Sequence, residues 1–110
     1  MYKITYLPIA NQDLMGIMRY ISEELCNPDA AQSLLDKIEH AISLLAEFPY
    51  AHPLHSLPMR LPRETRFFPV RNYLVFYVVL EPEHVVEIQR VIHSRMDRAG
   101  IGREGRTYSI

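Results

Sequence analysis

The chain has 110 residues, 48% of them hydrophobic and 23% charged, with a formal net charge of −1 at pH 7. This composition is ordinary for a soluble globular protein, and the length supports one domain with a single core. No apolar run approaches the roughly 20 residues of a membrane span. The N-terminus starts directly with strand-like alternation, so we expect a cytoplasmic protein with no membrane contact. The single cysteine, Cys26, has no partner for an internal disulfide and is expected to be an inert small residue.

Charge is divided unevenly along the chain. Residues 1 to 59 hold three cations against seven carboxylates, which gives −4, and residues 60 to 110 hold nine cations against six carboxylates, which gives +3. All nine cations of the second half are arginines. Because guanidinium groups bind carboxylate and phosphate oxygens at two points, an acidic protein segment and a nucleic acid both suit this half as partners. A solvated surface with a few ion pairs is the simpler alternative.

The first 25 residues predict a strand and a helix. Residues 2 to 7 alternate between the two sides of a strand. Pro8 then suits the first turn of a helix, where its missing N–H would be unused. One helical face is apolar over about residues 9 to 25, through Leu14, Ile17, Met18, Ile21 and Leu25.

A second helix is predicted directly after the first. Asn27 is a good cap, Pro28 fits the first helical position, and Asp29 lies in the positive first turn. The helical period then continues to Phe48, and Pro49 ends it. With one or two residues between them, the helices form an antiparallel hairpin.

Residues 49 to 64 predict an extended, semi-rigid loop. Four prolines in fourteen residues exclude a helix and most strand pairing. His52 and His55 lie in this loop, but no cysteine and no close carboxylate completes a metal site. We expect neither a metal nor a cofactor.

Residues 65 to 93 predict an antiparallel meander of three strands. Tyr73 to Leu80 is apolar or aromatic throughout, which suits a central strand buried on both sides. Thr65 to Val70 pairs with it across an Arg71-Asn72 turn, in which Asn72 is able to adopt a positive φ. The polar residues 81 to 84 form a second turn before the third strand, Val85 to His93.

In the third strand the alternation predicts two faces. Val86, Ile88 and Ile92 share the apolar face, whereas Glu87, Gln89 and His93 share the other. Arg90 is in phase with the apolar face. It must therefore be paired, lie at the rim of the helix layer, or follow a β-bulge that turns it outward. An ion pair with a helix carboxylate and a binding role are both open for Arg90.

Together these elements predict an α+β domain over residues 1 to 98. An N-terminal strand joins one edge of the meander, and the antiparallel helix hairpin packs on one face of the four-stranded sheet. The opposite face, ringed by arginines, is the predicted working surface. Residues 99 to 110 contain Gly and Arg without apolar period and are expected to be a flexible tail. If there is chemistry, His93 is the acid or base, and Arg66, Arg90 and Arg95 stabilise phosphoryl charge; a polar strand end is the alternative for His93.

In this order, several segments are familiar. They are Pro8 after a strand, Asn27-Pro28-Asp29-Ala30-Ala31, residues 44 to 49 (Leu-Leu-Ala-Glu-Phe-Pro), Arg66 followed by Pro69-Val70 and residues 72 to 77 (Asn-Tyr-Leu-Val-Phe-Tyr), and residues 90 to 97 (Arg-Val-Ile-His-Ser-Arg-Met-Asp). Over residues 1 to about 98 the chain resembles the RelE/ParE superfamily of bacterial toxins. The resemblance implies the toxin of a type II toxin-antitoxin, or plasmid stabilisation, system, neutralised by a cognate antitoxin whose acidic segment wraps the fold.

The resemblance leaves three activities open. The ending from Arg90 to Asp97 looks more like the gyrase-directed ParE branch, which implies growth inhibition by binding DNA gyrase without catalysis. The alternative is a ribosome-dependent mRNA endonuclease, for which His93, Arg95 and a displaced Tyr108 give a partial match. A third alternative is an inactive antitoxin-binding module, consistent with Ser94 and Met96 where many relatives carry Gly and a basic residue.

The expected site residues follow from these alternatives. A ribonuclease would use His93, Arg66 and Arg90 as catalytic groups. The expected target-binding residues are Arg66, Arg71, Arg90, His93, Arg95 and Arg98. The partners are the antitoxin and gyrase, or the ribosome and mRNA in the alternative.

Overall fold

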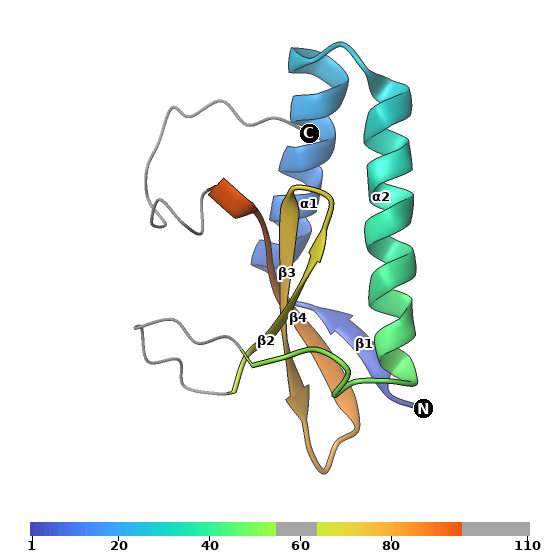
Figure 1. Cartoon of the computed structure of the whole chain (residues 1–110), viewed down its shortest axis with the longest axis vertical. Coiled ribbons are helices and arrows are strands. Elements are labelled where there is room, and N and C mark those ends of the chain that lie inside the picture. Colours follow the sequence, from blue (N-terminus) through green and yellow to red (C-terminus); the bar gives the residue numbers. More distant parts are fainter. Residues whose placement is uncertain (55–63, 96–110) are drawn as a thin grey trace.

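The computed structural model of the chain describes residues 1–54 and 64–95. The elements are β1 (Lys3–Tyr6), α1 (Pro8–Arg19), a π-helical turn (Tyr20–Glu24), α2 (Pro28–Ser43), a 3-10 turn (Leu44–Ala46), β2 (Arg66–Val70), β3 (Tyr73–Leu80) and β4 (Val85–His93) (Figure 1). The predicted α+β class, with a helix hairpin inserted between the first strand and a meander, is confirmed. No helix of the described ranges is long and apolar enough to cross a bilayer.

The four strands form one sheet in the order β1-β4-β3-β2. The meander β2-β3-β4 is antiparallel, as predicted, and β3 is an inner strand. β1 takes the edge beside β4 and runs parallel to it, from Lys3 opposite Val85 to Tyr6 opposite Ile88. The crossover through two helices makes this pair parallel, so the sheet is mixed. Because β1 ends at Tyr6, the last residues of β4 extend beyond it.

The helix starts agree with the sequence, and the helix ends do not. Pro8 opens α1, and the Asn27 side chain accepts a hydrogen bond from the Ala30 N–H at 3.2 Å. α1 ends at Arg19, short of the predicted residue 25, and continues as a π-helical turn. α2 ends at Ser43, before the predicted Phe48, and tightens into a 3-10 turn. Apolar spacing does not reveal these ends, because wider and tighter turns bury similar positions over one or two turns.

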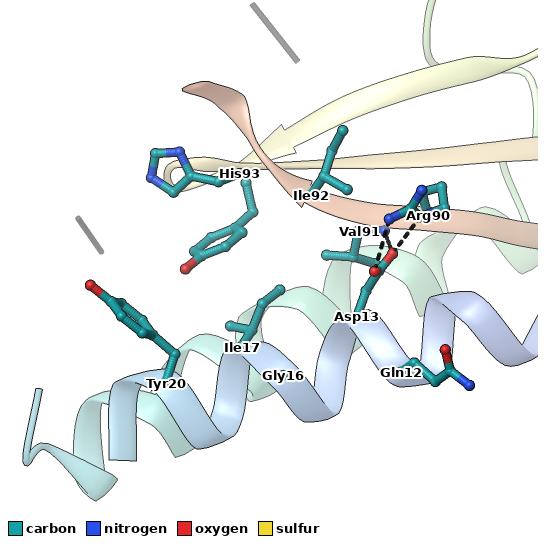
Figure 2. A pocket seen from close by; sticks show the side chains of 10 residues that line it. Gln12, Asp13, Gly16, Ile17, Tyr20, Arg90, Val91, Ile92 and His93 are labelled. Carbon is teal, nitrogen blue, oxygen red and sulfur yellow. Dashed lines mark hydrogen bonds and ion pairs between the residues drawn. The ribbon is translucent and has the colours of Figure 1, made fainter. Parts of the chain in front are cut away.

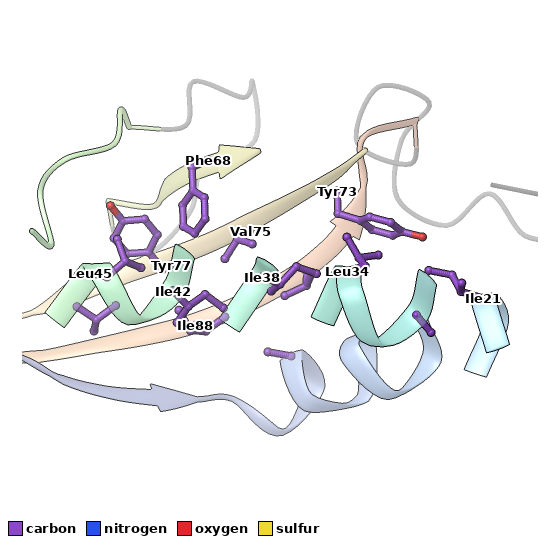
Figure 3. Close-up of a cluster of buried hydrophobic side chains, with 14 residues drawn as sticks. Ile21, Leu34, Ile38, Ile42, Leu45, Phe68, Tyr73, Val75, Tyr77 and Ile88 are labelled. Atoms are coloured by element: carbon purple, nitrogen blue, oxygen red, sulfur yellow. The ribbon is translucent and has the colours of Figure 1, made fainter. Parts of the chain in front are cut away.

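Both helices pack on one face of the sheet, where the core lies (Figure 3). Its fully enclosed side chains come from both layers: Ile21, Ile38, Ile42 and Leu45 from the helical part, and Val75, Tyr77, Val86 and Ile88 from the strands. β3 is buried continuously from Val75 to Val78, which confirms the strand predicted to be buried on both sides. Burying an aliphatic side chain of this size stabilises the fold by about 1.5–3 kcal/mol.

The turn between β2 and β3 consists of Arg71 and Asn72, as predicted, with a different backbone conformation. Arg71 has the positive φ, 56°, where the sequence suggested Asn72. A two-residue hairpin with one left-handed residue can require it at the first position, which here is arginine. The Asn72 carbonyl also accepts a hydrogen bond from the Ser94 N–H at 2.8 Å, which fixes this turn beside the end of β4.

A β-bulge corrects the predicted faces of β4. Phe76 pairs with Arg90 and Tyr77 pairs with Ile88, so Gln89 is an extra residue on β4. The alternation shifts by one position after it. Val91 and His93 therefore lie on the helix side, opposite Val75 and Tyr73, whereas Ile92 faces away with Leu74. The sequence had placed Ile92 on the apolar core face and His93 opposite it.

The face of the sheet away from the helices has an apolar centre in the described part of the chain, and Glu87 and Arg90 share this face as the register partners of Val78 and Phe76. Alternation places Phe67, Leu74, Phe76, Val78 and Ile92 on it. The Phe67 and Phe76 rings stack with their centroids 6.1 Å apart. Of the arginines predicted to ring this face, Arg90 therefore lies beside the apolar residues, directly opposite Phe76.

Candidate functional site

A pocket of about 340 Å³ lies between α1 and the part of β4 that extends beyond β1 (Figure 2). Side chains from one stripe of α1 and from the ends of β3 and β4 line it: Gln12, Asp13, Gly16, Ile17, Tyr20, Tyr73, Arg90, Val91, Ile92 and His93. Ile17 points from α1 toward β4, and Tyr20 points toward the end of the pocket marked by His93. The volume falls at the lower end of the range of ligand pockets, about 300–1,000 Å³.

Asp13 and Arg90 join the two walls of this pocket. Arg90 Nε donates to Asp13 Oδ2 at 2.8 Å and Arg90 Nη2 donates to Asp13 Oδ1 at 3.1 Å. The Val91 N–H donates to Asp13 Oδ2 at 3.0 Å, so the carboxylate occupies the place of a neighbouring strand's carbonyl where β1 has ended. These hydrogen bonds raise the pKa of Arg90 above its ordinary value, against the opposing effect of burial. The ion pair with a helix carboxylate, one of the two roles left open for Arg90, is confirmed.

His93 lies at the end of the pocket and is 5% exposed. Its ring meets the Tyr73 ring edge to face, with centroids 5.2 Å apart. Nδ1 accepts a hydrogen bond from the Arg95 N–H at 3.0 Å, so this nitrogen carries no proton in the arrangement described. The sequence placed Arg90 and His93 on opposite faces unless a bulge intervened. The bulge at Gln89 precedes both residues and leaves their relative phase unchanged, because Arg90 pairs with Phe76 and His93 pairs with Tyr73. Both line the pocket because the pairing of β1 with β4 ends at Ile88, and Arg90 reaches Asp13 at this open edge.

Two other predicted site residues lie at the same end of the sheet. Arg71 is exposed in the β2–β3 turn, and Arg95 is exposed two residues after His93. The hydrogen bond from Ser94 to Asn72 holds these two segments together. Arg98 lies outside the described residues. The end of the sheet beside the pocket therefore presents two exposed guanidinium groups.

Arg66 lies at the opposite end of β2 and does not join this site. Its Nη1 donates to the His52 carbonyl at 2.8 Å, and its guanidinium carbon lies 5.0 Å from the centre of the Tyr50 ring. The sequence grouped Arg66 with Arg90 and Arg95 as arginines that could stabilise phosphoryl charge. Arg66 starts β2, however, and the other predicted site residues lie beyond the end of this strand at Val70.

A second polar cluster lies around the β3–β4 turn, at the Arg66 end. Both the Tyr2 and the Tyr50 hydroxyls donate to Glu81 Oε2, the latter at 2.7 Å. The Tyr2 hydrogen bond lowers the pKa of Glu81, with help from Tyr50. In return, the hydrogen bond to Glu81 raises the pKa of Tyr2 to about 12. His84 stacks on the Tyr2 ring with centroids 4.9 Å apart. The cluster therefore joins the N-terminal segment before β1 and the loop after α2 to the β3–β4 turn.

Nothing in the described ranges forms a metal centre. No group of three metal-ligating side chains occurs there. His52 stacks on Phe68, with ring centroids 4.4 Å apart, and burial lowers its pKa. Its candidate partner His55 lies outside the described residues.

Of the ten residues that line the pocket, only Arg90 and His93 were predicted as site residues. Asp13, Tyr20 and Tyr73 sit inside ordinary helix and strand patterns, so their spacing carried no signal. Gly16 did carry one, because a glycine in a helix interior costs about 0.5–1 kcal/mol relative to alanine and usually has a packing or functional reason.

A helix hairpin on one face of a small mixed sheet, with a pocket and the exposed Arg71 and Arg95 at one end, defines a small α+β domain. The family model described as "ParE toxin of type II toxin-antitoxin system, parDE" matches residues 4–98, and the chain belongs to this family. A solved structure titled "Chromosomal ParDE TA system from P. aeruginosa" is similar, with a TM-score of 0.68 and 17% identity over 84% of this chain and 96% of that chain. At that identity the likeness concerns the fold. A comparison with curated proteins finds no match.

Proposed function

We propose that the chain is a toxin that arrests growth by binding DNA gyrase and that an antitoxin of the same locus neutralises it. Membership of the ParE toxin family over residues 4–98 supports the toxin role. The direction toward gyrase comes from the ending Arg90 to Asp97, which resembles the gyrase-directed branch. Such a module stabilises a plasmid or other replicon, and its target puts the toxin in the cytoplasm.

The observation that carries binding over RNA cleavage is the position of His93. A general acid or base must reach the proton it transfers within hydrogen-bonding distance. The His93 ring is 5% exposed and packs against Tyr73, and its Nδ1 already accepts the Arg95 N–H. Arg66, which would stabilise phosphoryl charge in the ribonuclease alternative, is engaged with His52 at the other end of β2. The three candidate catalytic groups are therefore not assembled around one point.

Exposed arginines supply the binding role in this proposal. Arg71 and Arg95 lie at the same end of the sheet, and both are exposed to solvent. Exposed guanidinium groups at an interface rim steer and orient a partner, and a well-desolvated arginine contributes more. We therefore expect the gyrase contact to include Arg95, with Arg71 beside it.

A supercoiling assay with purified gyrase tests the proposal. Wild-type protein is expected to inhibit supercoiling, and Arg95→Ala to need about tenfold more protein for the same inhibition, the effect of losing one good interface contact. Removal of residues 96–110 should weaken inhibition as well. Lys37→Ala, on the exposed side of α2, is the control and should inhibit like the wild type.

The two alternatives predict different results in the same samples. A ribonuclease would leave supercoiling untouched and cut messages in a ribosome-dependent translation reaction. An inactive module would do neither and would still bind its antitoxin tightly. Either result contradicts gyrase inhibition.

A further inference from the structure

One residue on the α1 side of the pocket, Gly16, has no packing role in the described part of the fold. Gly16 lies in the middle of α1 on the exposed side of the pocket, and a Cβ built there meets no atom within 4 Å. Gly16 is exposed, and no neighbouring backbone among the described residues lies close enough to require a glycine there. The helix therefore carries a destabilising residue without an internal packing reason.

The interior beside Gly16 suits an apolar side chain. Ile17 and Val91 contribute aliphatic surface, and Tyr20 points toward the end of the pocket marked by His93 (Figure 2). The Tyr73 ring also lines the pocket. The volume of about 340 Å³ has room for one large side chain together with part of the main chain that carries it. Side chains that fill such pockets are the usual anchors of protein interfaces.

The surroundings of the pocket favour an acidic partner. The one carboxylate that lines it, Asp13, is engaged by Arg90 and by the Val91 N–H, and its side chain is 14% exposed. Arg71 and Arg95 remain exposed at the adjoining end of the sheet. An approaching segment therefore meets positive charge next to an apolar cavity. Charge complementarity of this kind gives both orientation and fast association.

We propose that this pocket is the docking site of the antitoxin, which inserts one apolar or aromatic side chain past Gly16 and places carboxylates near Arg71 and Arg95. The inference rests on the proposed function, because it needs an antitoxin. The missing side chain at Gly16 lets the antitoxin main chain approach α1 closely. Gly16 thus weakens the free toxin slightly and improves the complex.

Substitutions at Gly16 separate docking from folding. The probe is the antitoxin of the same locus, identified as the neighbouring reading frame that restores growth and titrated calorimetrically into purified toxin. Gly16→Ala is expected to raise the melting temperature by a few degrees, because alanine favours helix and its methyl group meets open space. The same variant should bind the antitoxin about tenfold more weakly, and Gly16→Leu about 100-fold more weakly.

Two controls exclude a general surface effect. Met15→Ala changes the neighbouring residue of α1, which is 62% exposed and does not line the pocket. Ser33→Leu adds bulk to the exposed side of α2. Both should bind the antitoxin like the wild type, so a loss confined to the Gly16 variants locates the contact.

Three outcomes overturn the proposal. If Gly16→Leu folds and binds the antitoxin as tightly as the wild type, the pocket is not the docking site, while the proposed function stands. If Gly16→Leu keeps antitoxin binding and loses gyrase inhibition, the pocket serves the target. If the wild type binds no antitoxin at all, both this inference and the antitoxin part of the proposed function fail.

Discussion

The two ends of the sheet each hold a carboxylate among hydrogen-bond donors, and they use it differently. At one end, Asp13 joins α1 to the free edge of β4 through Arg90 and the Val91 N–H. At the other end, Glu81 accepts hydrogen bonds from the hydroxyls of Tyr2, which directly precedes β1, and of Tyr50, which lies in the loop after α2. The Asp13 side chain is 14% exposed and that of Glu81 is 38% exposed. The difference in burial predicts that Asp13 matters more for stability.

The pocket end also differs in what it leaves open. Beside Asp13 the walls diverge around a cavity that no described residue fills, and exposed arginines stand next to it. At the Glu81 end, the Arg66 guanidinium lies over the Tyr50 ring and donates to the His52 carbonyl. The Tyr77 hydroxyl donates to the Pro49 carbonyl. One end therefore closes the fold, and the other leaves a cavity beside two exposed arginines, where we propose that a partner docks.

Removing Asp13 should have the largest effect on stability. Asp13→Ala leaves the partly buried Arg90 guanidinium and the Val91 N–H without their acceptor, which costs about 2–3 kcal/mol. Thermal melts should show a fall in Tm of roughly 10 °C or more for a chain of this size. Asp36→Ala is the control, because Asp36 is exposed on α2 and accepts one hydrogen bond from the Gln32 side chain. Equal melting temperatures for the two variants would contradict the role assigned to Asp13.

Removing the Tyr77 hydroxyl, at the Glu81 end of the sheet, should have an intermediate effect on stability. It donates to the Pro49 carbonyl at 2.8 Å and is fully buried, so Tyr77→Phe leaves that carbonyl without this donor. The cost is about 1 kcal/mol, or a Tm lower by roughly 4–8 °C. Urea unfolding of Tyr77→Phe beside Tyr50→Phe measures it, because the exposed Tyr50 hydroxyl should contribute less. A Tyr77→Phe variant as stable as the wild type would show that this contact does not hold the loop.

Replacing Glu81 should have the smallest effect on stability, and this effect should depend on pH. Its pKa is lower in the folded protein, so its contribution is present above about pH 4.5 and is lost as pH falls through the folded value. The pKa of Tyr2 is raised to about 12, so its contribution is present below pH 10 and is lost as pH rises through about 12. The difference in urea midpoint between wild type and Glu81→Gln should therefore shrink at acidic pH. A difference that stays constant from pH 7 down to pH 3 would rule out this linkage.

The sequence predicts the elements of this fold well because each carries its own periodicity. The apolar run from Tyr73 to Leu80 and the cap at Asn27 lead directly to β3 and to the start of α2. The ends of the helices are less predictable, since Ile21 is buried within a π-helical turn as it would be in an α-helix. The parallel pairing of β1 follows from the crossover and not from any residue of β1.

The site was predictable only in part. Arg90 in the core phase was a sign of a bulge or an ion pair, and both occur. The sequence does not show that Gln89 is the extra residue of the bulge. Uninterrupted alternation therefore places His93 on the face away from the helices, whereas the structure places it on the helix side. Arg66 was grouped with Arg90 on residue type, although strand geometry separates them. The pocket forms only where α1 packs beside β4, so the sequence does not show it. Its one sequence signal is Gly16, a glycine inside a helix.

The most direct test of the central claim, that this toxin acts by binding and not by catalysis, is the growth of cells that express His93→Gln. Glutamine cannot transfer a proton as histidine does, and loss of an acid or base costs a ribonuclease about 100-fold or more in rate. Antitoxin binding and the melting temperature establish that the variant is folded. The account predicts growth arrest close to that of the wild type, with supercoiling inhibited. A folded His93→Gln variant that binds the antitoxin and has lost all toxicity would contradict it and assign the protein to RNA cleavage.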